Sequence, residues 1–266
     1  MALLAELHAE SGAAAGTSAW SPRVGIVMLT AAVSLLVLHY LKYRGAFYAA
    51  LGWLAPWLDM TPRALVIAVR RDPYGALYGQ AWWVGWCAVS YVLLPMLSIR
   101  FLLRDRIRDM GVGLGTLGRH WRWYVVLVSP ILVFVVLVSF RPDFSHYYPF
   151  YRGAHLSWAD LLIWEALYLT QFVCLEFFFR GFLVHALRPA LGVNAVFVMC
   201  VPYLMIHFPK PWLEATGAIL FGLFLGVLSL RSRSIWGGVC VHVTVALSMD
   251  IAALLQGPGL PGSFLR

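Results

Sequence analysis

The stretch that decides the fold covers residues 158–188 and reads WADLLIWEALYLTQFVCLEFFFRGFLVHALR. As a helix it would be about 46 Å long at a rise of ~1.5 Å per residue, which exceeds the ~30 Å hydrocarbon core of a bilayer. Because the run is apolar apart from a few charged residues, we predict a transmembrane helix that tilts or protrudes. Glu176 lies near the middle of this helix.

Comparable apolar runs recur along the chain and predict a polytopic membrane protein. They lie near residues 24–41, 80–98, 123–140, 191–207, 213–230 and 234–254. An eighth run, residues 46–60, is short and interrupted by Pro56, which leaves open whether it crosses, re-enters or lies at the interface. In the run 213–230, Gly222 and Gly226 form a GxxxG pattern, which favours close helix packing. We predict an all-α polytopic transmembrane helix bundle of seven or eight spans.

The composition excludes a soluble globular protein. Hydrophobic residues make up 61% of the chain, charged residues only 12%, and the mean hydropathy is +0.78, whereas soluble domains carry roughly 25% charged residues. The net charge of +8 comes from basic residues that lie mostly between the apolar runs, where anionic headgroups attract them. They form no stripe typical of nucleic-acid binding, so we expect a lipid bilayer and no nucleic acid as partner. All four cysteines lie inside apolar runs, where disulfides are not expected.

We divide the chain into four parts. Residues 1–22 are rich in Ala, Ser and Gly and are predicted to form a mobile tail; residues 23–154 hold N-terminal transmembrane helices and basic loops; residues 155–255 form a transmembrane core; and residues 256–266 form a C-terminal tail. Arginines crowd residues 100–122, so the positive-inside rule places that loop in the cytoplasm. The topology of the N-terminal half stays open because it depends on the short eighth run.

Ionisable side chains inside the spans are functional candidates, since each costs roughly 2.5–3.5 kcal/mol at the centre of an inserted helix. They concentrate in the last four spans and comprise Glu165, Glu176, Arg180, His185, His207, Glu214, His242 and Asp250. Glu176 and Arg180 are four residues apart, the spacing of an ion pair on one helical face. Such a pair either fixes helix packing alone or holds an ionised carboxylate ready to act as a base.

Two histidines and two carboxylates are available to one cavity: His207, His242, Glu176 and Glu214. Imidazole and carboxylate are the groups that activate water for peptide hydrolysis, and they are also zinc ligands. His207 lies ~10 Å from the middle of its run, so a shared site requires a short or sunken helix. His185 is expected to be solvated near the cytoplasmic side.

These residues resemble a family pattern, that of the CPBP intramembrane proteases, the CAAX-processing and bacteriocin-processing group that includes the Rce1-like prenyl-protein endopeptidases. The pattern is two adjacent Glu and, after three residues, Arg; then Phe-xxx-His; then His-xxx-Asn in a late span. Glu176 and Arg180 match the first motif, Tyr203 to His207 is similar to the second, and His242 is similar to the start of the third. The likeness covers about residues 155–255, and it depends on the order and spacing of the motifs together.

The resemblance implies an intramembrane endopeptidase. Glutamate and histidine would activate water against a peptide bond of a membrane protein or peptide, with His242 stabilising the oxyanion and Glu214 as a possible accessory residue. No cofactor is required by this implied mechanism, and zinc is not favoured. We expect an integral protein of a bacterial cytoplasmic (inner) membrane.

Two departures from the family pattern keep alternatives open. Leu175 stands at the first Glu of the pair, and Ala246 stands at the Asn of the last motif. A catalytically inactive relative with an immunity, scaffold or chaperone role is therefore the second hypothesis. A proton-coupled transporter is the third, because protonatable residues in spans also build proton relays.

Overall fold

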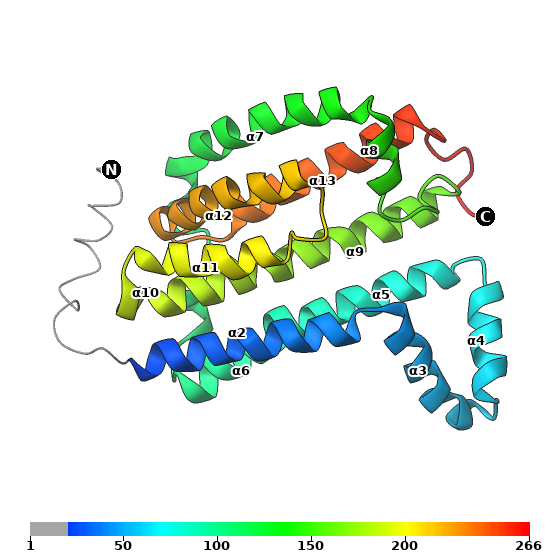
Figure 1. The fold of residues 1–266 in the computed structure, drawn as a ribbon, viewed down its shortest axis with the longest axis horizontal. Helices are drawn as coiled ribbons and strands as arrows, with labels where there is room; N and C mark the ends of the chain where they lie inside the picture. The colour runs from blue at the N-terminus through cyan, green and yellow to red at the C-terminus, as the bar shows by residue number, and fades with distance from the viewer. Residues whose placement is uncertain (1–20) are drawn as a thin grey trace. The chain divides into compact units, whose positions relative to one another are not determined.

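The computed structural model describes residues 21–266, so the predicted mobile tail lies, apart from its last two residues, outside the described residues. Over the described range the chain forms helices and connecting turns and no strand, which confirms the all-α prediction (Figure 1). The connections before and after residues 117–139 carry short helices, η4 (Ile107–Met110) and α8 (Pro142–Tyr147) respectively.

Six helices in the described range are long and apolar enough to cross a membrane, and the chain is accordingly an integral membrane protein. They are α2 (Pro22–Leu41); Gly75–Leu102, composed of α5 (Gly75–Ala88), η2 (Val89–Leu93), α6 (Leu94–Leu97) and η3 (Ser98–Leu102); α7 (Leu117–Ser139); Trp158–Leu191, composed of α9 (Trp158–Glu176), η5 (Phe177–His185) and α10 (Ala186–Leu191); α12 (Trp212–Ser232); and α13 (Trp236–Gln256). The predicted count of seven or eight spans is not confirmed.

The apolar run 191–207 contains only a short helix, α11 (Asn194–Met205). Its 12 residues give a length of about 18 Å, well below the ~30 Å of a hydrocarbon core. Hydropathy alone does not reveal how short this helix is, because the turns at its two ends are apolar too. At one end Gly192 adopts a positive φ of 58°, and at the other a turn leads to Pro211 and the start of α12.

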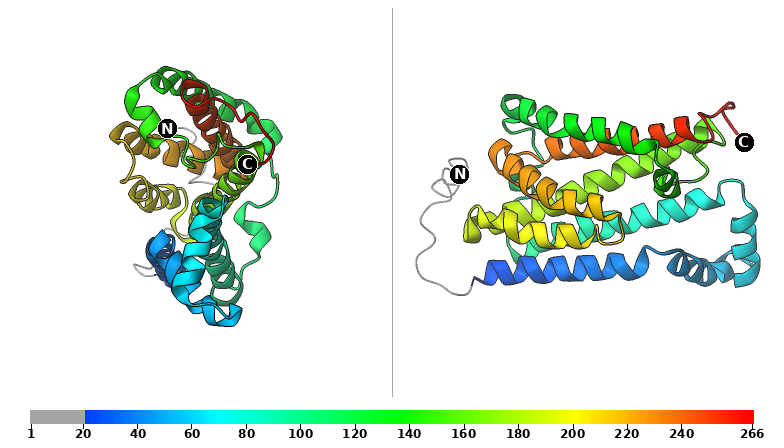
Figure 2. Two further views of the ribbon diagram at one scale, coloured as in Figure 1. Left: turned by 90° about the vertical axis from the view of Figure 1, so that its right-hand side faces the viewer. Right: turned by 45° about the horizontal axis from the view of Figure 1, so that its top comes forward.

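The helices α11 and α12 lie side by side and antiparallel (Figure 2). A Cβ atom added at Gly222 would lie 3.0 Å from the Tyr203 ring, and one added at Gly226 would lie 2.7 Å from Val196. The missing side chains therefore allow the close approach that the GxxxG pattern predicts. This packing fixes the position of Tyr203.

The run 46–60 does not form a span. It folds into α3 (Arg44–Leu54) and η1 (Ala55–Leu58), and α4 (Pro62–Arg71) returns beside α3 (Figure 1). An 11-residue helix is about 16 Å long and cannot cross the bilayer. Trp53 and Trp57 are 83% and 87% exposed, and tryptophan favours the membrane–water interface. These observations favour an interfacial hairpin whose two ends lie on the same side.

The chain divides into two compact units, each described here by itself. Unit 1 comprises residues up to Ser34, Tyr91–Leu127 and Val173–Val241, and unit 2 comprises Leu35–Ser90, Val128–Phe172 and His242–Arg266. The core of unit 1 is centred on η5, whose nine residues are all buried.

The core of unit 2 contains an aromatic stack on α9. The buried Trp164 stacks on Tyr168 with ring centroids 4.8 Å apart, and its indole N–H donates to the carboxylate of Asp250 at 2.7 Å. Asp250 is itself buried. A buried carboxylate needs such donors, so this contact gives Asp250 a structural role in unit 2.

Candidate functional site

The predicted ion pair between Glu176 and Arg180 forms at the junction of α9 and η5. Arg180 Nη1 lies 2.8 Å from Glu176 Oε1, and both side chains are 0% exposed. Each charge offsets the cost of burying the other, and loss of one partner would leave an uncompensated charge in the interior. The pair begins a π-helical segment, a conformation frequently found at functional sites.

The first turn of α13 presses directly on the Glu176 carboxylate. A Cβ atom added at Gly238 would lie 2.0 Å from Glu176 Oε2 and 2.6 Å from Cδ, so only glycine fits there without displacement. The neighbouring Gly237 makes room in the same way for the ring of Tyr124, whose hydroxyl is 3.2 Å from Ser232 Oγ. The sequence alone does not mark either glycine as a contact of the site, although the pair precedes the motif histidine His242.

Tyr203 connects the ion pair to His207. The Arg180 guanidinium carbon lies 4.1 Å from the centroid of the buried Tyr203 ring, in cation–π geometry. The ring of His207 lies 4.7 Å from the same Tyr203 ring, measured between centroids. We call Glu176, Arg180, Tyr203 and His207 the Glu–His array. A shared site requires a short or sunken helix before His207. The helix α11 meets this requirement, because it is short and ends two residues before His207.

A hydrogen bond fixes the tautomer of neutral His207. Its Nδ1 is 2.7 Å from the main-chain oxygen of Tyr203. A carbonyl oxygen only accepts hydrogen bonds, so Nδ1 carries the proton and donates. The Nε2 atom of the neutral ring then keeps its lone pair and can accept a proton.

The other two predicted site residues lie in different surroundings. His242 belongs to unit 2, where its ring stacks on Phe172 with centroids 5.2 Å apart and an interplanar angle of 10°. Its convergence with the Glu–His array stays a prediction. Glu214 lies in the first turn of α12 and pairs with Lys210 at 3.3 Å, and its accessory role also stays a prediction.

The expectation that His185 is solvated is wrong. His185 is buried, and its Nε2 lies 3.2 Å from Ser229 Oγ. The loop before α7 covers it, since a Cβ atom added at Gly111 would lie 2.9 Å from the same Nε2. The indole of Trp236 secures this loop by donating to the main-chain oxygen of Val112 at 2.8 Å.

The two positions that depart from the family pattern are filled by apolar packing residues. Leu175 lies in unit 1 and Ala246 in unit 2, and both are buried. Neither side chain offers a polar atom to a reacting group. The Glu–His array therefore has one carboxylate where the family pattern has two.

The expectation that no zinc is required stays a prediction. Among the described residues, no three His, Cys, Asp or Glu side chains gather closely enough to hold a metal, whereas catalytic zinc is bound by three protein ligands. The Glu–His array supplies one carboxylate and one imidazole. None of the four cysteines, all within the described residues, forms a disulfide.

The fold and the site together define a helical integral membrane protein with a buried carboxylate–guanidinium pair beside a histidine. Residues 156–248 match the family model described as type II CAAX prenyl endopeptidase Rce1-like. Over these residues the match agrees with the predicted resemblance to the CPBP family. The matched segment includes the Glu–His array and His242. No curated protein and no solved structure shows significant similarity to the chain.

Proposed function

We propose that the protein is an intramembrane endopeptidase that hydrolyses a peptide bond of a membrane protein or peptide, at or within the bilayer. The observation that carries the proposal is the buried Glu–His array inside an Rce1-like domain. Members of that family are typically intramembrane proteases. The six candidate spans suit a substrate that is itself held in the membrane.

In the proposed mechanism the array activates a water molecule. His207 Nε2 takes a proton from water as the oxygen attacks the carbonyl carbon, and Glu176 orients the water through its carboxylate. Arg180 holds the Glu176 carboxylate in place through their ion pair. His242 donates to the oxyanion. The C–N bond then breaks as His207 returns the proton to the leaving amine.

Cleavage by the purified protein in liposomes tests this function. The probes are membrane-anchored peptides with and without a farnesyl group, and mass spectrometry detects the products. Glu176→Gln preserves the shape of the side chain and should lower turnover by about 100-fold, because the amide cannot orient the water as the carboxylate does. Asp59→Asn is the matched control, since it makes the same acid-to-amide change at an exposed residue of the interfacial hairpin. Unchanged cleavage by a folded Glu176→Gln protein would remove Glu176 from the mechanism.

A catalytically inactive membrane protein with an immunity, scaffold or chaperone role is the second candidate. The buried apolar side chains of Leu175 and Ala246 favour it. It predicts that separate substitutions of Glu176, His207 and His242 leave biological activity intact. Loss of activity in all three variants at normal expression would contradict it.

We place the protein in the cytoplasmic membrane of a bacterium. The arginine-rich connection of residues 100–122 supports an orientation with that loop in the cytoplasm. Fractionation of a bacterial host should recover the protein with the inner membrane. Recovery in the outer-membrane fraction would contradict this location.

A further inference from the structure

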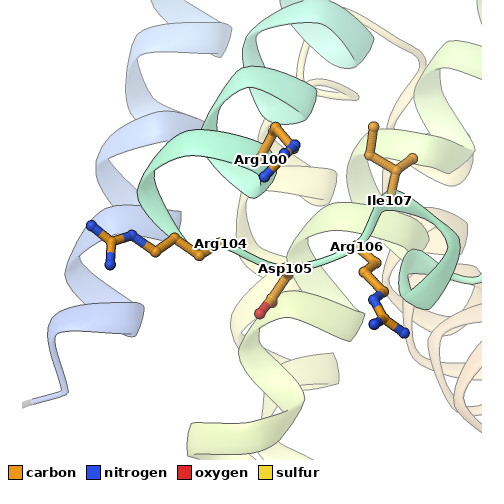
Figure 3. A pocket seen from close by; sticks show the side chains of 5 residues that line it. All are labelled: Arg100, Arg104, Asp105, Arg106 and Ile107. Atoms are coloured by element: carbon orange, nitrogen blue, oxygen red, sulfur yellow. The ribbon is translucent and has the colours of Figure 1, made fainter.

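A pocket rich in arginine lies where the span Gly75–Leu102 ends (Figure 3). Its volume is about 450 Å³, and it is lined by Arg100, Arg104, Asp105, Arg106 and Ile107. That volume falls within the roughly 300–1,000 Å³ of small-molecule sites. All five lining residues belong to unit 1, and the proposed function does not use any of them.

The pocket is formed by a defined turn of the main chain. After the π-helical η3, Leu103 N donates to Ser98 O at 2.9 Å and Asp105 N donates to Ile99 O at 3.0 Å. Arg104 between them has a φ of 58°, a left-handed conformation that costs a non-glycine residue free energy and is concentrated at functional sites. In Figure 3, Arg104 and Arg106 extend to opposite sides of this turn, with Arg100 on the helix above.

The pocket carries uncompensated positive charge. Its single acid, Asp105, is held by Arg23, whose Nη1 and Nη2 atoms lie 2.7 and 2.9 Å from the two carboxylate oxygens. Within the described part of the chain no carboxylate pairs with Arg100, Arg104 or Arg106. Three arginines therefore line a cavity whose own carboxylate is already paired with Arg23.

Exposed apolar side chains lie on the last turns of the span that leads to the pocket. Phe101 and Leu102 are 67% and 60% exposed, and Leu97 one turn earlier is exposed as well. A span that presents apolar side chains and then arginines marks the boundary between hydrocarbon and headgroups. A ligand with a phosphate in the pocket can lay its acyl chains along these residues, which favours a lipid over a free phosphate.

We propose that this pocket binds the phosphate-bearing headgroup of an anionic phospholipid. The planar fork of arginine matches phosphate oxygens in a bidentate way. The positive charges of all three arginines attract the headgroup of an anionic lipid. A zwitterionic lipid also carries an ammonium group, which these charges repel. The positive-inside orientation places the site in the cytoplasmic leaflet, where anionic lipids are found.

Binding of spin-labelled phosphatidylglycerol to the protein in phosphatidylcholine vesicles tests the proposal. The triple variant Arg100→Gln/Arg104→Gln/Arg106→Gln should bind the labelled lipid roughly 100-fold more weakly, because it removes every arginine that lines the pocket. The matched control is Arg108→Gln/Arg119→Gln/Arg122→Gln, which removes the same charge from exposed positions outside the pocket. The control should keep the affinity of the unmodified protein.

Each other outcome overturns the proposal. Equal weakening in both triple variants would mean that general surface charge, and no specific site, attracts the lipid. Competition by glycerol 3-phosphate as strong as that by phosphatidylglycerol would assign the pocket to a free phosphate ester. Thermal unfolding of both variants controls for folding, and because the lining arginines are exposed we expect unchanged midpoints.

Discussion

Replacing Gly238 with alanine adds one methyl group at the point where α13 touches the Glu176 carboxylate. The new Cβ atom would lie 2.0 Å from Glu176 Oε2, and real Cβ contacts essentially never fall below 3.0 Å. The carboxylate or the helix must therefore move by about 1 Å. The contact is to a side chain that Arg180 holds in place at 2.8 Å, so the carboxylate cannot retreat without loosening the ion pair.

Two opposing effects set the size of the change. Overpacking of a buried site costs about 1–3 kcal/mol, and alanine stabilises a helix over glycine by about 0.5–1 kcal/mol. The net effect is a destabilisation of up to ~2 kcal/mol, or a Tm lower by a few degrees in a chain of this size. If the array is catalytic, a displacement of about 1 Å lowers turnover by about 100-fold.

Thermal unfolding in detergent and peptide cleavage in liposomes measure the two effects. Gly217→Ala is the matched control, because a Cβ atom there meets nothing within 4 Å in α12, and it should leave Tm unchanged or slightly higher. Glu176→Asp retracts the carboxylate, so the double variant with Gly238→Ala should lose less stability than the two single changes combined. Equal Tm and turnover for Gly238→Ala and Gly217→Ala would refute the reasoning.

Three further predictions concern the ion pair, the aromatic contact and the hairpin. Arg180→Met leaves the carboxylate of Glu176 buried without its cation and should cost about 3–5 kcal/mol in unfolding free energy, whereas Arg180→Lys should cost less; equal stability of both variants would contradict the pairing. Tyr203→Phe keeps the ring beneath the guanidinium and should retain most stability, while Tyr203→Leu should lose the ~0.5–2 kcal/mol of a cation–π contact in thermal unfolding; the same loss for both would assign the effect to the hydroxyl. Single cysteines at Arg44 and Arg71 should react with a membrane-impermeant maleimide from the same side of sealed vesicles, since the hairpin is too short to cross; reaction from opposite sides would show a crossing.

Local spacing in the sequence predicted part of the site correctly. The pairing of Glu176 with Arg180 follows from helical periodicity, because residues four apart share a helix face. The packing role of Gly222 and Gly226 is local in the same sense, since small residues one turn apart leave a groove for a neighbouring helix. Both predictions need only the regular geometry of one helix.

Contacts between distant segments could not be predicted in this way. Gly238 contacts Glu176 only because α13 packs against the end of α9. A single sequence does not show how closely these two helices pack. The length of α11 could not be predicted from the sequence either, because the apolar composition of residues 191–207 continues beyond the helix ends. His185 is buried by a loop whose course depends on Trp236 and Gly111. Neither residue indicates in the sequence that this loop covers His185.

The shortness of α11 has an elastic consequence for the surrounding lipid. A helix of about 18 Å beside a hydrocarbon core of ~30 Å leaves a mismatch of about 12 Å, and lipids adjust to such a mismatch by thinning at a cost of fractions of a kcal/mol per Å. Met205 and Phe208, on either side of His207, are exposed, and such apolar side chains favour contact with acyl chains. Bilayers of short-chain lipids accommodate this local thinning at a lower free-energy cost than thick bilayers. Acyl-chain length therefore sets how near the aqueous phase comes to His207.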